Sequence, residues 1–366
     1  MKKSKIARLG TLENDYKKLG IKPDRILQRE DGLRTSGKFG EYEWWYFDAK
    51  LDGGYSLVIV FFSQPVTAAT VGYAPSVYFS LKGRGNEILE EVSAPIEECM
   101  FERKRCYAKI GNNVIEGDLR NYTVHFENER INCDLSLKGL AKSYRHKTGH
   151  IFFGEKKYFA WLPTVPEGKV EADINIEGSE YHFEGSGYHD HNWGNVGMFW
   201  LMHHWYWGRA KVGDYQVISS YITANEEYGY EHFPIFVIYK NGVRLGCDID
   251  AIKYEQRDEE FDPITQKHYH KTLVYDYNDK SNHFRVTYNA ENIIETFVAA
   301  EGEGTARAKA SKTMLKLVKL MKLSPSYIRF TGKVTLERFE GNEVVETVVA
   351  DNAIWEQMYF GLDADV

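Results

Sequence analysis

The sequence predicts an all-β protein with two tandem domains of antiparallel strands, each a barrel or a sandwich. Aromatic residues make up 14% of the 366 residues, and aromatic side chains favour strands. Apolar and polar residues alternate from Val170 to Ile176, as expected for a strand with one solvated face. Short motifs also recur at an offset of about 160 residues, which indicates a duplicated domain.

The repeated motifs occur in the same order in both halves of the chain. Residues 45–47 (Trp-Tyr-Phe) match residues 205–207 (Trp-Tyr-Trp), an offset of 205 − 45 = 160. Further along each half, Lys169-Val170 recurs as Lys333-Val334. An ordered series of matches at a near-constant offset is typical of a duplicated domain rather than of a short solenoid repeat.

Three segments follow from this repeat. Residues 1–35 are polar and carry no strand pattern, so we expect them to wrap around the surface. Residues 36–195 and 196–366 are the two predicted β-domains, and we expect the turn at residues 188–194 to line their junction. A barrel of about eight strands can hold one small ligand.

One amphipathic helix is predicted at residues 306–323. Met314, Leu317, Val318 and Met321 form an apolar stripe, and lysines occupy the remaining surface. We expect this helix to pack against a barrel with its lysines in solvent. The alternative is a lid or a peripheral membrane contact, since basic amphipathic helices can lie on anionic lipid.

Charge and cysteine content narrow the class of protein. The net charge is −7, so we expect no nucleic-acid partner. No secretory signal and no run of about 20 apolar residues is visible, so we expect a cytoplasmic protein, with membrane association as the alternative. The cysteines form no C-x-x-C pair and are interpreted as reduced core residues: Cys99, Cys106, Cys133 and Cys247.

The segment 187–194, Gly-Tyr-His-Asp-His-Asn-Trp-Gly, carries the most unusual chemistry in the chain. It places two imidazoles, a carboxylate, a carboxamide, a phenol and an indole in six consecutive positions. Buried polar groups need partners, so a packed core has little use for such a mixture. The segment therefore indicates a site where acid–base groups meet a large apolar ligand.

We expect Asp190 and His191 to form the acid–base pair of this site, with Trp193 and Trp45 as the pocket wall and Glu43 as a reserve acid. This pairing requires the chain to turn within the segment, because successive strand positions point to opposite faces. The neighbouring glycines would permit such a turn. In an extended segment the two residues would separate. His189 and His191 would then be functional, and Asp190 would be structural.

The remaining candidates are expected to bind substrate. Aromatic faces stabilise cations by roughly 0.5–2 kcal/mol each, and amide or basic groups can orient a ligand. Alternatively, Glu43 only pairs with Arg209 or a lysine, and the Trp-rich strands are only barrel core. The expected substrate-binding residues are Tyr188, His189, Asn192, Trp44, Trp45, Tyr46, Trp205, Trp207 and Arg209.

A metal site is the main rival interpretation of the histidines. His189, His191, His203 and His204 lie in a short span, and His-x-His on a strand places both rings on one face. The sequence compels no third ligand. We therefore expect neither a metal nor another cofactor.

Three segments resemble the lipocalin-like carotenoid 1,2-hydratase (hydroxyneurosporene synthase) and AttH-type family. They are residues 41–49 (Glu-Tyr-Glu-Trp-Trp-Tyr-Phe-Asp-Ala), 187–194 and 353–358 (Ala-Ile-Trp-Glu-Gln-Met). The resemblance spans the chain from about residue 38 onward. It implies two tandem lipocalin-like domains with a hydrophobic site near their junction. Its members include hydratases of isoprenoid and prenyl double bonds and fungal relatives that catalyse pericyclic cyclisations.

The resemblance also implies roles for single residues. The His-x-Trp pair that helps catalysis in the hydratases matches His191 and Trp193. A Tyr-x-Asp pair on a following strand is thought to supply the acid in that family. The corresponding strand here, residues 215–221, contains no carboxylate.

Three functions therefore remain open. The first is an enzyme that protonates an alkene of a hydrophobic isoprenoid or polyene substrate, leading to hydration or cyclisation. The second is a pericyclase or isomerase of a linear polyene, and the third is a non-catalytic lipocalin-like carrier. The acid–base groups favour the first, because burial can keep a carboxyl protonated at neutral pH. The missing strand carboxylate favours the other two, and the substrate and oligomeric state stay open.

Overall fold

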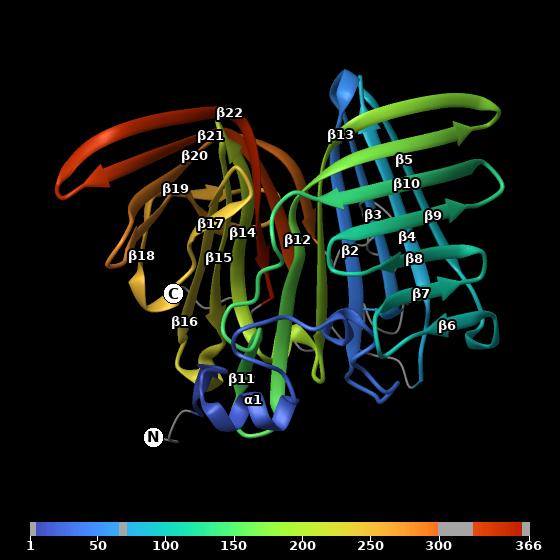
Figure 1. Cartoon of the computed structure of the whole chain (residues 1–366), viewed down its shortest axis with the longest axis horizontal. Helices are drawn as coiled ribbons and strands as arrows, with labels where there is room; N and C mark the ends of the chain where they lie inside the picture. Colours follow the sequence, from blue (N-terminus) through green and yellow to red (C-terminus); the bar gives the residue numbers. More distant parts are fainter. Residues whose placement is uncertain (1–4, 66–71, 299–324, 361–366) are drawn as a thin grey trace. The chain divides into compact units, whose positions relative to one another are not determined.

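The computed structural model describes residues 5–65, 72–298 and 325–360. Within this part of the chain the fold is all-β, with two antiparallel sheets and one short α-helix, α1 (Glu13–Leu19), as Figure 1 shows. The predicted fold class is confirmed. The predicted helix at residues 306–323 lies outside the described residues. Over the described ranges, no helix is long and apolar enough to span a membrane.

The chain divides into two compact units. The first, called here the N-terminal unit, comprises Arg8–Met198. The second, the C-terminal unit, begins at Phe199 and includes the short stretch that ends at Ala7. Each unit is built around its own sheet.

The N-terminal unit contains a 13-stranded sheet. Its strand order is β5-β4-β3-β2-β13-β12-β10-β9-β8-β7-β6, with β11 paired to β12 and β1 paired to β11. The strands are β1 (Ala7–Leu9), β2 (Tyr42–Leu51), β3 (Tyr55–Gln64), β4 (Ser76–Gly83), β5 (Asn86–Ser93), β6 (Cys99–Phe101), β7 (Cys106–Ile110), β8 (Asn113–Gly117), β9 (Asn121–Glu127), β10 (Ile131–Gly139), β11 (His150–Phe153), β12 (Lys157–Ile176) and β13 (Ser179–Gly194).

This sheet bends along its two longest strands, so that β6–β10 run across β2–β4 in Figure 1. The register of β12 against β13 shifts on either side of Val165, and Gly168 faces Gly187 just beyond the shifts. Bulges and paired glycines permit such bends. One apolar core fills the concave side, where Phe79 of β4 stacks on Phe126 of β9 with ring centroids 4.7 Å apart.

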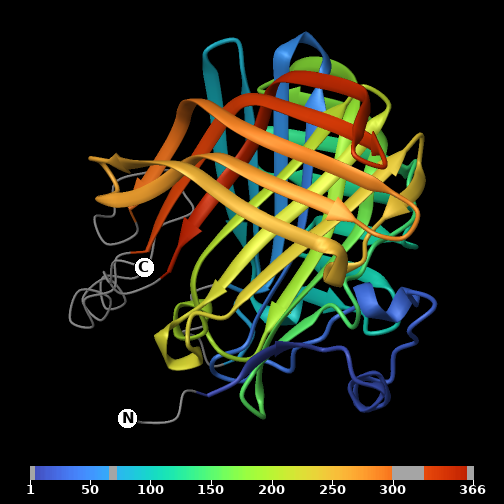
Figure 2. The ribbon, with the colours of Figure 1, turned by 90° about the vertical axis from the view of Figure 1, so that its left-hand side faces the viewer.

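The C-terminal unit contains a nine-stranded sheet, which faces the viewer in Figure 2. Its order is β17-β16-β15-β14-β22-β21-β20-β19-β18. Its core is rich in tyrosine and includes Trp355. The strands are β14 (Met202–Val212), β15 (Tyr215–Ala224), β16 (His232–Lys240), β17 (Val243–Gly246), β18 (Ile252–Asp262), β19 (Lys267–Asn278), β20 (His283–Val298), β21 (Ser326–Glu340) and β22 (Glu343–Tyr359).

The two sheets share a strand order around their centres. In both, four strands joined in sequence lie beside a long later hairpin: β2–β5 beside β13 and β12, and β14–β17 beside β22 and β21. Trp45 and Trp205 are nevertheless not equivalent. Trp45 packs into the core of its unit, whereas in the C-terminal unit the core residue is Tyr206, one position after Trp205. The difference comes from the hairpins: three residues join β2 to β3, but only two join β14 to β15. Because side chains alternate between the two faces of a strand, a shift of one residue moves each side chain to the other face.

Candidate functional site

The segment that carries the unusual chemistry is extended and lies at the centre of the N-terminal sheet. Residues 188–194 form the last part of β13, which pairs with β2 on one side and β12 on the other. Asp190 and His191 therefore point to opposite faces, and their predicted acid–base pairing is wrong. The alternative for an extended segment, with His189 and His191 functional and Asp190 structural, stays a prediction beside the role proposed for Asp190 below. The glycines do not turn the chain. At Gly185, for example, a Cβ would lie 2.2 Å from the Lys50 carbonyl oxygen, so glycine permits close strand contact.

On the core face of β13, Glu43 binds a histidine and the N-terminal segment. Its carboxylate lies 2.9 Å from His191 Nε2 and accepts hydrogen bonds from the backbone N–H groups of Arg34 (2.6 Å) and Thr35 (2.9 Å). Glu43 and His191 are fully buried. This arrangement gives Glu43 a clear role in holding residues 34–35 against the sheet. Its predicted role as a reserve acid stays a prediction.

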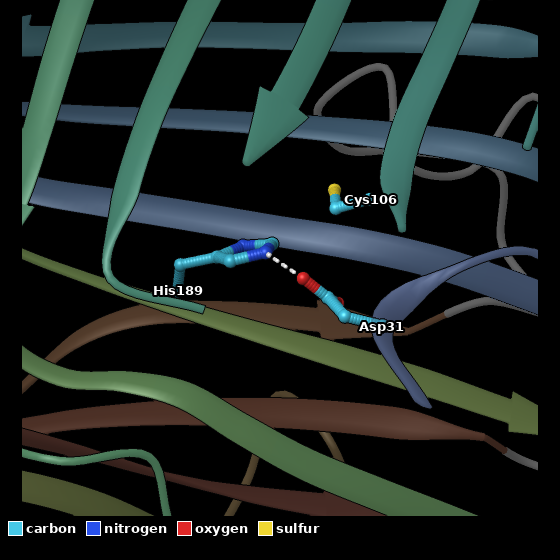
Figure 3. A group of neighbouring side chains, drawn as sticks. All are labelled: Asp31, Cys106 and His189. Atoms are coloured by element: carbon cyan, nitrogen blue, oxygen red, sulfur yellow. Dashed lines mark ion pairs between the residues drawn. The ribbon is translucent and has the colours of Figure 1, made fainter. Parts of the chain in front are cut away.

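Asp31 enters the same core face from the short 3-10 helix Gln28–Asp31. It accepts a hydrogen bond of 2.6 Å from the Tyr122 hydroxyl, and its carboxylate lies 3.6 Å from His189 Nε2 and 3.5 Å from His191 Nδ1. Figure 3 shows Asp31 and His189 pointing towards each other with Cys106 beside them, and the ligand atoms of all three lie within 4.8 Å of one another. The end of the segment predicted to wrap around the surface is therefore inside the unit. We name Asp31, Glu43, Cys106, Tyr122, His189 and His191 the core-face cluster.

Two indole rings enclose His191 on this face. Trp45 stacks on it with ring centroids 4.7 Å apart, and the Trp193 ring lies at 4.6 Å. Trp45 belongs to the apolar core of the unit, and Trp193 belongs to a smaller buried cluster with Leu162. The predicted wall residues thus share a face with His191 and not with Asp190.

On the opposite face of β13, Asp190 receives three hydrogen bonds. The Tyr188 hydroxyl (2.7 Å) and the Trp161 indole N–H (2.8 Å) donate to one carboxylate oxygen, and the Asn192 amide (2.7 Å) donates to the other. Burial raises the pKa of Asp190 to about 6, and the Tyr188 and Trp161 hydrogen bonds oppose that rise. Burial and the charge of Asp190 also hold the pKa of Tyr188 well above its usual range, so the phenol remains a donor.

Aromatic and aliphatic side chains surround this carboxyl on the same face. Tyr46 pairs with Asp190 across the strands, its ring lies edge-on to Tyr188 at 6.4 Å, and its hydroxyl donates to Asp48 over 3.2 Å. Trp44 lies opposite Asn192. Buried Val58, Val60 and Tyr78 of β3 and β4 extend the face. We name these residues, with Trp161, Tyr188, Asp190 and Asn192, the Asp190 face.

The predicted substrate-binding residues therefore separate into three groups. Tyr188, Asn192, Trp44 and Tyr46 share the Asp190 face, whereas His189 and Trp45 lie on the core face. Trp205, Trp207 and Arg209 belong to β14 of the C-terminal unit, where they alternate with core residues and point away from its core.

The histidines of the rival metal interpretation also separate. His203 and His204 belong to the C-terminal unit, where their Nδ1 atoms lie 2.8 Å apart and the Tyr359 hydroxyl lies 2.8 Å from His203 Nε2. His189 and His191 instead lie near Asp31, and Cys106 lies close to Asp31 and His189. Sequence analysis did not name Asp31 and interpreted Cys106 only as a core cysteine. No spacing pattern connects residue 31 to residues 106 and 189, so only the fold could bring them together.

Comparisons with known proteins agree with this architecture. A family model described as Diels-Alderase-like matches residues 38–298. The quinolone epoxide rearrangement protein asqO of Emericella nidulans is 25% identical over 229 residues, covering 58% of this chain and 62% of that protein. The hydroxyneurosporene dehydrogenase of Chlorobaculum tepidum is 25% identical over 214 residues, covering 47% and 54%. The chain thus aligns with somewhat more than half the length of these curated relatives.

A solved structure shares the fold at low sequence identity. The crystal structure of CghA with Sch210972 superposes with a TM-score of 0.60 and 12% identity, covering 92% of this chain and 96% of that one. At this identity the likeness concerns the fold alone. The family model spans most of the chain, and the predicted resemblance is confirmed. The protein belongs to the Diels-Alderase-like family, which is related to the hydroxyneurosporene and AttH-type proteins.

Proposed function

We propose that this protein is an enzyme that protonates an alkene of a hydrophobic isoprenoid or polyene and thereby starts a hydration or a cyclisation. One observation carries the proposal. A buried carboxyl, Asp190, lies among three hydrogen-bond donors on a sheet face that is otherwise mainly aromatic and aliphatic. A buried aromatic environment around a well-held acid is what alkene protonation requires.

The chemistry assigns roles to Asp190 and to the residues around its carboxyl on the Asp190 face. The Asp190 proton forms a new C–H bond as the alkene π bond breaks, which leaves a tertiary carbocation. The rings of Tyr46 and Trp161 can stabilise that cation by roughly 0.5–2 kcal/mol each. Water then adds and releases a proton, or a second alkene attacks and closes a ring before a proton is lost.

The three donors act on the carboxylate that remains after proton transfer. Hydrogen bonds to a charged group contribute about 1.5–3 kcal/mol each, so Tyr188, Trp161 and Asn192 favour the ionised product of this step. They are in place before reaction, as preorganised electrostatic catalysis requires. The proton released at the end of the reaction returns to Asp190.

Family membership supports a hydrophobic small molecule as the substrate. Relatives include a quinolone epoxide rearrangement protein and a Diels-Alderase of Pyricularia oryzae that is 27% identical over 173 residues. The family model's description also favours a second candidate function, a pericyclase that folds a linear polyene without proton transfer. A non-catalytic carrier is the third possibility carried over from the sequence.

Deuterium incorporation distinguishes these functions. Purified protein is incubated in D₂O with acyclic isoprenoids that carry trisubstituted alkenes, and with any apolar compound extracted from the purified protein. The proposal expects a product that gains one carbon-bound deuterium, together with the mass of water if hydration follows. A cyclised product without deuterium would instead establish the pericyclase, and unchanged compound recovered in a stable complex would establish the carrier.

Two matched variants locate the acid. Asp190→Asn should abolish deuterium incorporation while the protein remains folded by circular dichroism. Asp48→Asn changes a second buried carboxyl on the same face and should retain it. Incorporation that persists in folded Asp190→Asn would refute the assignment of the acid.

A further inference from the structure

The core-face cluster contains three buried polar atoms that have no hydrogen-bond partner among the described residues. They are Asp31 Oδ1, His189 Nε2 and His191 Nδ1, and their side chains are at most 1% exposed. Leaving a buried polar atom unpaired costs roughly 1–3 kcal/mol. Asp31 Oδ1 lies 3.5 Å from His191 Nδ1, and the other Asp31 oxygen lies 3.6 Å from His189 Nε2. Three such atoms gathered in one buried core indicate a positive or polar centre among them.

The distances within the cluster fit a metal ion better than direct hydrogen bonds. Asp31 lies 3.6 Å from His189 Nε2 and 3.5 Å from His191 Nδ1, beyond the usual 2.7–3.2 Å of a hydrogen bond. Ligands at about 2.0–2.1 Å from a tetrahedral zinc ion lie about 3.3–3.4 Å from each other. The Cys106 thiol adds a soft donor, since the ligand atoms of Asp31, Cys106 and His189 all lie within 4.8 Å of one another (Figure 3).

Outer contacts hold three of the four donors, His189, His191 and Asp31, in place. The Tyr46 carbonyl can only accept, so His189 Nδ1 donates to it over 2.8 Å and Nε2 keeps its lone pair. Glu43 likewise binds His191 Nε2 at 2.9 Å and leaves Nδ1 free to ligate. The Tyr122 hydroxyl donates to Asp31. Metal-bound histidines and carboxylates are held in this way by surrounding carbonyls, carboxylates and hydroxyls.

We propose that the N-terminal unit binds one zinc ion through Asp31, Cys106 and His189, whose ligand atoms lie within 4.8 Å of one another. His191 is outside that group, but its Nδ1 lies 3.5 Å from Asp31, and it moves in as the fourth ligand when the ion binds. Binding releases the Cys106 thiol proton to solvent, so that one carboxylate and one thiolate balance the charge of the ion. The site is closed and fully buried, which is typical of structural zinc and not of catalytic zinc. The ion ties the segment at residues 28–35 to β7 and β13.

Metal analysis of the purified 366-residue chain tests this proposal directly. The protein is produced in zinc-supplemented medium, dialysed against a weak chelator, and its zinc content is measured by mass spectrometry. The expected value is about one zinc per chain, retained until a strong chelator is added. A zinc content near zero, both as purified and after titration with zinc, would overturn the proposal in favour of a water molecule or direct ion pairs.

Cobalt substitution identifies the ligands through a readout independent of activity. Wild-type protein loaded with Co²⁺ should show a thiolate-to-cobalt charge-transfer band. The band should persist in Cys133→Ser, a control that alters another fully buried cysteine of the same core. It should disappear in Cys106→Ser, whose cobalt affinity should fall at least about tenfold. A band that persists in folded Cys106→Ser would place the metal elsewhere and refute the site.

Discussion

The two units fill the same central positions of their sheets with different chemistry. Counting back four residues from the end of β2 and of β14 makes Phe47 equivalent to Gly208. The residues paired with them, His189 on β13 and Trp355 on β22, are therefore equivalent too. The C-terminal unit accommodates an indole at this position because a Cβ on Gly208 would lie 2.7 Å from that of Trp355.

The opposite faces of these strands are more alike than the core faces. Asp190 pairs with Tyr46, and Glu356 pairs with the equivalent Trp207. Asp190 accepts from Trp161 on β12, and Glu356 accepts from the Tyr327 hydroxyl on β21 over 2.7 Å. On the core face, by contrast, Trp355 of the C-terminal unit stands where the N-terminal unit has His189, so the fold is compatible with an aromatic residue there.

The fold therefore does not require buried histidines and carboxylates on this face, and the core-face cluster needs a separate explanation.

The largest expected effect compares the two carboxylates. Asp190→Asn should reduce turnover by about 10²–10⁴-fold, the usual contribution of a general acid. Glu356→Gln should change turnover less than about threefold, because we assign the acid to the N-terminal unit alone. Steady-state kinetics measures the turnover of both variants, with the substrate that the deuterium-incorporation experiment identifies. Equal losses in two folded variants would contradict this division of labour.

The aromatic core of the C-terminal unit should be the most sensitive to truncation. Trp355 is 2% exposed, so Trp355→Ala should lower the free energy of unfolding by about 3–5 kcal/mol. Trp200 is 46% exposed, and Trp200→Ala should cost less than about 0.5 kcal/mol. Urea denaturation followed by circular dichroism gives both values. Similar losses in the two variants would show that the core does not depend on Trp355.

The N-terminal unit should lose stability in acid through His150. Burial lowers the pKa of His150 to about 4, so the unfolded chain takes up the proton first as the pH falls below about 6.5. The free energy of unfolding therefore falls as the pH is lowered from about 6.5 to about 4. At pH 5 the loss from His150 is about 2 kcal/mol. Unfolding in urea at pH 7 and pH 5 should show a smaller acid loss for His150→Gln than for wild type.

An exposed histidine of the same unit serves as the control for this pH dependence. His182 lies on the surface beside Asp173, so His182→Gln should leave the acid loss nearly unchanged. If His150→Gln loses as much stability at pH 5 as wild type, another group causes the acid sensitivity.

The smallest expected effect concerns the phenols beside the two carboxylates. Tyr188→Phe removes one of three donors to Asp190 and should lower turnover by about tenfold. Tyr327→Phe removes the equivalent contact to Glu356 and should leave turnover unchanged. A larger loss in folded Tyr327→Phe than in Tyr188→Phe would reverse the assignment of the active carboxylate.

Local patterns in the sequence predicted the strands but not their exact equivalence. The alternation at residues 170–176 lies in β12 as expected, and the repeated motifs fall on corresponding strands. A hairpin that is one residue shorter in the second half reverses the face of Trp205 relative to Trp45. Side-chain periodicity is two, so an offset counted in residues is insufficient wherever turn lengths differ.

The candidate site was predictable in composition but not in geometry. The chemistry of residues 188–194 was visible in the sequence, whereas their extended conformation was decided by pairing with β2 and β12 on both sides. The glycines suggested a turn because glycine permits one, yet here each relieves crowding between strands. Asp31 could not be found, because its contacts are 189 − 31 = 158 and 122 − 31 = 91 residues away.

This separation has a consequence for the order in which the protein can form during synthesis. β2 is translated early, but its central partner β13 ends at Gly194, and Asp31 cannot meet His189 until 158 further residues have been made. At about 5–20 residues per second, that interval lasts roughly 8–30 s. From the completion of β3 until β13 has been made, the Trp-rich strand beginning at Tyr42 has one unpaired edge. Nascent chains of this protein are therefore expected to depend on ribosome-associated chaperones until β13 emerges.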